Sequence, residues 1–139
     1  MNDRCAAGTG IFLEVIAKTL GYGIEAFGEE ALKARHEVQI NSMCTVFAQS
    51  EVTSLSAKRQ KREDIAFGIH AAILNRTLPL LKRVSTAEDI VFAEGVVRNS
   101  CFKYLLEKAL WKIVKVPSDP QLVGAFGAAI IAQESVGRR

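Results

Sequence analysis

The chain has 139 residues, of which 49% are hydrophobic and 24% are charged, and its formal net charge is +3. This length holds one domain, or part of one, with a real hydrophobic core. The small charge argues against a nucleic-acid partner, and the basic run 58–62 is interpreted as a solvated loop between helices. No apolar run has the length of a membrane span, and no basic-then-apolar leader begins the chain. We therefore expect a cytoplasmic protein with no membrane partner.

The first stretch of interest is residues 2–10, which place Cys5 and two glycines just before the apolar helical run 11–17. Glycines let the backbone turn sharply into a helix whose first N–H groups are free. A helix start carries partial positive charge and suits an anion such as a phosphate, a thiolate or a metal cluster. An ordinary helix start with small residues fits this short pattern equally well.

Apolar spacing, glycines and capping residues divide the chain into helices and short extended pieces. We expect helices over residues 10–20, 24–35, 44–58, 63–84, 100–110 and 120–134, with a frayed tail over 135–139. Pro79 should kink or split the fourth helix, and Asp119 with Pro120 should begin the last one. Residues 37–40 alternate as a short extended piece and 41–42 form a turn, so Cys44 opens the third helix.

Two strands are expected, over 89–93 and 111–116, on either side of the helix 100–110. A strand–helix–strand–helix order normally gives parallel strands. Two strands make a poor sheet on their own. We therefore expect residues 1–139 to be a single partial domain, part of a larger α/β domain whose first strands lie upstream.

The cysteine count is odd, with Cys5, Cys44 and Cys101 and no C-x-x-C pair. A cytoplasmic chain is not stapled by disulfides. One chain cannot supply the four thiolates of a four-cysteine metal site, whereas two chains could supply two each.

Four segments resemble one family, the ATP-dependent activators of 2-hydroxyacyl-CoA dehydratases and the ATPase subunits of benzoyl-CoA reductase. Residues 1–14 resemble its cluster-binding segment, and residues 41–52 resemble its second cysteine segment. Residues 95–99 resemble its adenosine-binding loop, and residues 117–125 resemble the start of its last helix. The two cysteine segments in this order make the resemblance specific, and it covers nearly the whole chain.

The resemblance implies a helix-rich α/β fold, the C-terminal portion of an acetate and sugar kinase/Hsp70/actin-type (ribonuclease H-like) ATPase domain. It implies a homodimer that shares one [4Fe–4S] cluster, with Cys5 and Cys44 as ligands and no ligand role for Cys101. The family uses ATP to drive one electron onto a dehydratase or reductase component, which would be the partner here. The cofactor-binding positions that we assign are Gly8, Thr9, Gly10, Glu51, Gly95 and Asn99; no catalytic residue is assigned.

Two departures from the family pattern bear on activity. The family's phosphate-binding loops would lie upstream of this segment, so we expect the chain alone to be inactive as an ATPase. The adenosine loop usually begins Thr-Gly-Gly, whereas this chain has Ala93, Glu94 and Gly95. A carboxylate at Glu94 should weaken or abolish binding of ATP or ADP through its bulk and its charge.

Three functions therefore compete. The chain is the cluster-binding half of an electron-transfer activator, a non-catalytic dimerisation or binding module, or the nucleotide-binding lobe of a sugar-kinase-like enzyme without a cluster. Cys5 and Cys44 discriminate among them, because the third function gives them no role. His36 and His70 have no ligand spacing and are interpreted as surface or core residues.

Overall fold

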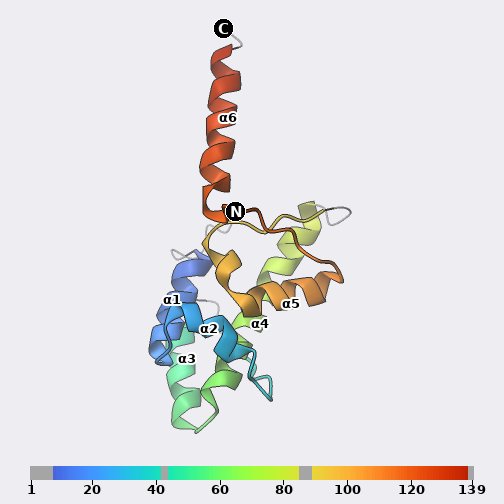
Figure 1. Cartoon of the computed structure of the whole chain (residues 1–139). Helices are drawn as coiled ribbons and strands as arrows, with labels where there is room; N and C mark the ends of the chain where they lie inside the picture. The colour runs from blue at the N-terminus through green and yellow to red at the C-terminus, as the bar shows by residue number, and fades with distance from the viewer. Residues whose placement is uncertain (1–7, 42–43, 85–88, 138–139) are drawn as a thin grey trace.

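The computed structural model describes residues 8–41, 44–84 and 89–137. Within these ranges the chain forms six α-helices and two short 3₁₀ helices (Figure 1). Their bounds are α1 Thr9–Thr19, α2 Ile24–Ala31, α3 Thr45–Ala57, α4 Arg62–Val84, η1 Gly95–Arg98, α5 Ser100–Leu110, η2 Pro120–Leu122 and α6 Val123–Gly137. Each expected helix is present, and no described helix is long and apolar enough to cross a membrane.

Some helix ends differ from the expectation, for local reasons. Helix α2 ends at Ala31 rather than at residue 35, because the Asp64 carboxylate accepts hydrogen bonds from the backbone N–H groups of Arg35 and His36. Those two bonds turn the chain out of the helix. Helix α6 continues to Gly137, where a frayed tail was expected.

Pro79 does not split α4, which runs on to Val84. Proline removes the hydrogen bond to the carbonyl four residues earlier, here that of Asn75. Asn75 is exposed, so water is available to satisfy that carbonyl. Asp119 does not cap the last helix with its side chain, although Pro120 does occupy the first helical position.

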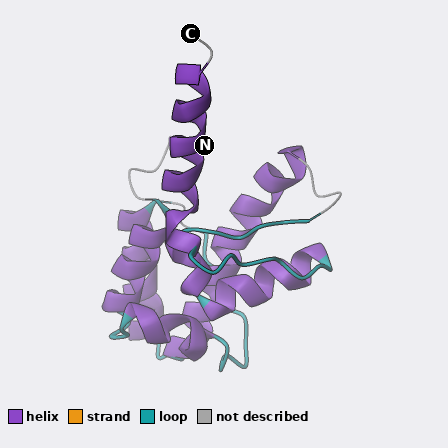
Figure 2. Cartoon of the chain, turned by 45° about the horizontal axis from the view of Figure 1, so that its top comes forward, coloured by secondary structure: helices purple, strands orange, loops and turns teal. Residues whose placement is uncertain are grey.

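The two expected strands are wrong as strands, although their parallel direction is confirmed. Within the described residues, the only β-type pairing is an isolated parallel bridge between Val91 and Lys115. The segments around these residues lie side by side as loops in Figure 2. Trp111 takes a left-handed conformation that ends α5, which removes the start of the second strand. Val91 is 58% exposed, so this segment is not the buried run that the sequence suggested.

The core lies where α2 packs against α4 and α5, with α1 packed against α3. Its largest fully buried side chains include Leu13 and Ile16 of α1, Phe27 of α2 and Ile65 and Ile69 of α4. Helix α6 has no buried residue and extends away from the other helices (Figure 1).

Candidate functional site

A cavity of about 280 Å³ lies where the start of α1 meets η1. It brings together three of the six residues predicted to bind a cofactor, namely Gly10, Gly95 and Asn99. The other lining residues are Leu13, Glu14, Ile24, Glu25, Val96, Arg98 and Gln121. Segments separated by more than eighty residues therefore meet at one cavity.

Glycine matters at two positions of this cavity wall. A Cβ atom built on Gly10 or on Gly95 has no heavy atom within 4 Å. The space beside both residues is therefore open to a ligand, and a larger side chain there would take up part of it.

Asn99 connects the cavity to α5. It is the N-cap residue of that helix, and its Oδ1 accepts a hydrogen bond from the Phe102 backbone N–H at 2.9 Å. Capping of this kind satisfies one of the free donors of the first turn. Only 8% of Asn99 is exposed, so its position is fixed by the surrounding protein.

His70 is a core residue, one of the two interpretations that the sequence allowed, but its contact with the site residue Asn99 was not predicted. It is fully buried in α4, with Nδ1 2.7 Å from the Ala66 carbonyl oxygen and Nε2 2.9 Å from Asn99 Nδ2. Burial lowers the pKa of His70 to about 4, against the smaller opposing effect of its hydrogen bonds with Ala66 and Asn99. A signal was present: Ala66, His70 and Leu74 follow the four-residue spacing of a buried helix face.

Glu94 is not among the residues that line the cavity, and its expected effect on nucleotide binding stays a prediction. Its carboxylate Oε1 accepts a hydrogen bond from the Gly124 backbone N–H at 3.1 Å. Glu94 itself has a left-handed backbone, with φ 69°. The loop therefore keeps a conformation suited to glycine, while the new side chain is held at the start of α6.

The remaining predicted cofactor-binding residues lie outside the cavity wall. Gly8 and Thr9 form the exposed start of α1. Glu51 lies on α3, where its Oε1 accepts a hydrogen bond from the Asn41 backbone N–H at 3.2 Å. Their assignment to a cofactor stays a prediction.

The structure describes one of the two predicted cluster ligands. Cys44 is an exposed free cysteine at the N-cap position of α3, and Cys5 lies outside the described residues. Cys101 is buried, and burial raises the pKa of its thiol to about 12. Among the described residues no group of three or more metal-binding side chains gathers, so one chain offers no complete metal site there.

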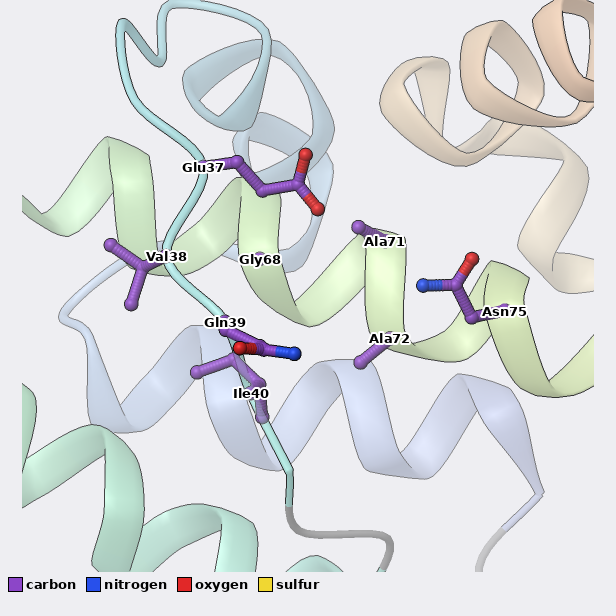
Figure 3. A pocket seen from close by; sticks show the side chains of 8 residues that line it. All are labelled: Glu37, Val38, Gln39, Ile40, Gly68, Ala71, Ala72 and Asn75. Atoms are coloured by element: carbon purple, nitrogen blue, oxygen red, sulfur yellow. The ribbon is translucent and has the colours of Figure 1, made fainter.

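A second cavity of about 320 Å³ lies between residues 37–40 and α4. Figure 3 shows the side chains of Glu37, Gln39 and Asn75 around a floor made by Ala71 and Ala72. None of the predicted site residues lines this cavity.

Comparison with known proteins identifies relatives of this chain. The 2-hydroxyisocaproyl-CoA dehydratase activator of Clostridioides difficile is 42% identical over 132 residues, which is 95% of this chain and 50% of that protein. The (R)-2-hydroxyglutaryl-CoA dehydratase activating ATPase of Acidaminococcus fermentans is 39% identical over 138 residues, 99% of this chain and 53% of that protein.

The fold is shared as well. A solved structure of the Clostridium difficile activator with bound ADPNP superposes with a TM-score of 0.83 at 40% identity, over 99% of this chain and 53% of that one. The chain thus spans about half the length of the curated relatives it matches. The expected ATPase fold of the actin and Hsp70 type is confirmed by this match. Residues 1–132 match the BadF/BadG/BcrA/BcrD ATPase family, and the chain belongs to that family.

Proposed function

We propose that this chain is the adenosine-binding and cluster-binding half of an ATP-dependent electron-transfer activator. The observation that carries the proposal is the 280 Å³ cavity, in which Gly10 of α1 meets Gly95 and Asn99 of the adenosine-type loop. Helix α1 follows directly on the segment that holds Cys5. A nucleotide in the cavity would therefore touch the helix that begins four residues after the predicted cluster ligand Cys5 in the sequence.

The lining of the cavity suits the nucleoside part of ATP better than its phosphates. Ile24 and Val96 offer apolar surface to a purine base, as ligand pockets commonly do. The carboxylates of Glu14 and Glu25 can accept hydrogen bonds from amino or hydroxyl groups and repel phosphate oxygens. They outnumber the one cationic side chain of the wall, Arg98, whose Nη2 donates to Gln121 Oε1 at 3.1 Å. We infer that the cavity binds adenosine and that contacts to the phosphates come from elsewhere.

The exposed thiol of Cys44 fits the cluster that the resemblance implies. An accessible cysteine at the start of a helix has the free sulfur and the positive helix end that favour a thiolate ligand. We propose that Cys5 and Cys44 from each of two chains hold one [4Fe–4S] cluster in a homodimer. Bound there, such a cluster would carry single electrons to a dehydratase or reductase component.

The nucleotide part is tested by titrating the 139-residue chain with ADPNP, ADP and adenosine in a calorimeter. We expect binding weaker than about 1 μM, which corresponds to about −8 kcal/mol, and similar affinities for the three ligands. No ATP hydrolysis above background is expected from this chain alone. Gly95→Val should abolish binding, because its side chain enters open space in the cavity.

Gly127→Ala is the matched control, because Gly127 is another glycine with open space beside it, on α6 and away from the cavity. It should leave the affinity unchanged. Equal binding by the wild type and Gly95→Val, or no binding by the wild type, would refute the adenosine site.

A further inference from the structure

His70 and Asn99 form a hydrogen-bonded chain with only one consistent assignment of donors and acceptors. The Ala66 carbonyl is an acceptor, so His70 Nδ1 must carry the proton and donate to it across 2.7 Å. In a neutral imidazole the other nitrogen is then an acceptor. His70 Nε2 therefore accepts from the Asn99 amide nitrogen across 2.9 Å.

This assignment also fixes the orientation of the Asn99 amide. With Nδ2 directed at His70, Oδ1 is left to accept the hydrogen bond from Phe102 N–H that caps α5. If the amide were reversed, two acceptors would face each other at His70 and two donors at Phe102. Both ends of the Asn99 side chain are thus engaged, one by α4 and one by α5.

Helix α2 packs against both His70 and Asn99. The Phe27 ring lies 4.8 Å from the His70 ring, centroid to centroid. A Cβ atom on Gly28 would come within 2.9 Å of Asn99 Oδ1 and of the Ser100 backbone nitrogen. Helix α2 thus packs directly against both partners, with Phe27 on His70 and Gly28 on Asn99.

We propose that neutral His70 is a positioning residue, which holds the Asn99 amide and thereby fixes the loop 95–99 that lines the 280 Å³ cavity. Its effect on nucleotide affinity rests on the function proposed above. His70 does not itself line the cavity, so it would act only through Asn99. A residue at this position that cannot accept the Asn99 hydrogen bond should loosen both the α5 cap and the cavity wall.

The test uses three variants of the 139-residue chain. His70→Leu removes the acceptor, and His70→Gln supplies a side-chain oxygen that can accept from Asn99. Leu74→Ala removes a buried side chain one turn further along α4, and it serves as the control for general destabilisation. Two quantities are measured: hydrogen exchange of the Phe102 amide under native conditions, and the affinity for ADPNP.

We expect His70→Leu to speed exchange at Phe102 and to weaken ADPNP binding about tenfold, the loss expected when a buried partner is left unsatisfied. His70→Gln should restore both. Leu74→Ala should leave the ADPNP affinity near its wild-type value, and it should speed exchange of the Phe102 amide no more than that of other core amides, because general destabilisation raises all openings together. Unchanged Phe102 exchange in His70→Leu, or equal losses of affinity in His70→Leu and Leu74→Ala, would overturn the positioning role. Faster Phe102 exchange in His70→Leu together with no ADPNP binding by the wild type would support the positioning role and refute only the nucleotide function.

Discussion

The Glu94 carboxylate accepts a hydrogen bond from the Gly124 backbone N–H at 3.1 Å, so the loop before η1 also holds the start of α6. A second bond has the opposite direction: the Glu94 backbone N–H donates to the carbonyl of Pro120 in η2 at 2.7 Å. The fit is close, because a Cβ atom on Gly124 would lie 2.9 Å from Glu94 Oε1. Glu94 makes this contact with φ 69° and ψ −169°, a strained backbone conformation that only glycine adopts easily.

Comparing Glu94→Ala with Glu94→Gly separates the backbone strain at residue 94 from the hydrogen bond between its side chain and Gly124. Both variants lose the bond to Gly124, which should cost about 1 kcal/mol in the free energy of unfolding. Only the glycine variant relieves the backbone strain, which is about 1–3 kcal/mol. We therefore expect Glu94→Gly to be more stable than Glu94→Ala by at least about 1 kcal/mol in urea unfolding. Equal stability of the two variants would mean that the loop is not strained at Glu94.

The cysteines should differ sharply in their effect on iron binding. Protein made without oxygen should contain about two irons per chain, the stoichiometry of one four-iron cluster shared by two chains. Cys5→Ser and Cys44→Ser should each abolish the iron and the brown colour. Cys101→Ser should retain both, because burial holds the Cys101 thiol protonated, with its pKa raised to about 12. The ligand assignment would be wrong if Cys101→Ser alone bleached the protein.

His70 should make the stability of the chain depend on pH in one window. Burial lowers its pKa from 6.5 to about 4 in the folded state, so between these values the unfolded chain binds more protons. The free energy of unfolding should fall by about 3 kcal/mol as the pH drops from 6.5 to 4, at about 1.4 kcal/mol per unit. Urea unfolding across this range measures the slope.

His70→Gln is the control for that slope, because it removes the titrating group and should flatten the dependence. Asp64 affects the free energy of unfolding only below this pH range, because its pKa in the folded chain lies below 3.8. Burial raises its pKa, but the hydrogen bonds from His36 and Arg35 N–H outweigh that effect and leave the pKa below its usual 3.8. The stability that Asp64 contributes is thus present above its usual pKa and is lost as the pH falls further. An unchanged slope between pH 6.5 and 4 in His70→Gln would show that His70 is not its source.

The sequence predicted each of the six described α-helices, because apolar spacing and glycine stops are local signals. The sequence-based prediction failed where contacts between distant residues determine the local structure. The end of α2 depends on Asp64, which lies about thirty residues away in the chain, and the strands depend on neighbours that their own residues do not specify. Gly10, Gly95 and Asn99 were identified as site residues from the family motifs, and the structure brings them to one cavity. The role of His70 could not be foreseen, because its partner Asn99 is brought to it only by the packing of α5 on α4.

Gly68 should be intolerant of any side chain. A Cβ atom there would lie 2.0 Å from the Val38 carbonyl oxygen, so residues 37–40 would have to leave α4. Gly68→Ala should therefore lower the free energy of unfolding by at least about 2 kcal/mol, despite the better helix propensity of alanine. Gly127→Ala on α6 meets no atom within 4 Å and should raise stability by up to about 1 kcal/mol. Denaturant titration of both variants distinguishes the close contact from propensity, and a stable Gly68→Ala would contradict the observed contact.

Several large apolar side chains on α6 and after α5 are exposed and could associate with another chain. On α6, Phe126 is 69% and Ile131 is 65% exposed, and Trp111 and Ile113 after α5 are 93% and 85% exposed. Apolar surface of this kind associates with a driving force of about 25 cal/mol per Å² buried, and it needs no metal. We therefore expect the chain not to be a monomer, even after the iron has been removed with a chelator. Light scattering with and without chelator measures this, and Cys44→Ser should associate as the wild type does without iron.

Replacing Phe126 and Ile131 by lysine should weaken that metal-independent association, because two charges on α6 oppose burial of the helix. The cluster should form in the double variant as it does in the wild type, since neither residue lies in the predicted cysteine segments. Loading the double variant with iron should then restore a dimer, and removing the iron should dissociate that dimer into monomers. A clean monomer of the iron-free wild type at about 10 μM would show that this apolar surface is too small to hold two chains together.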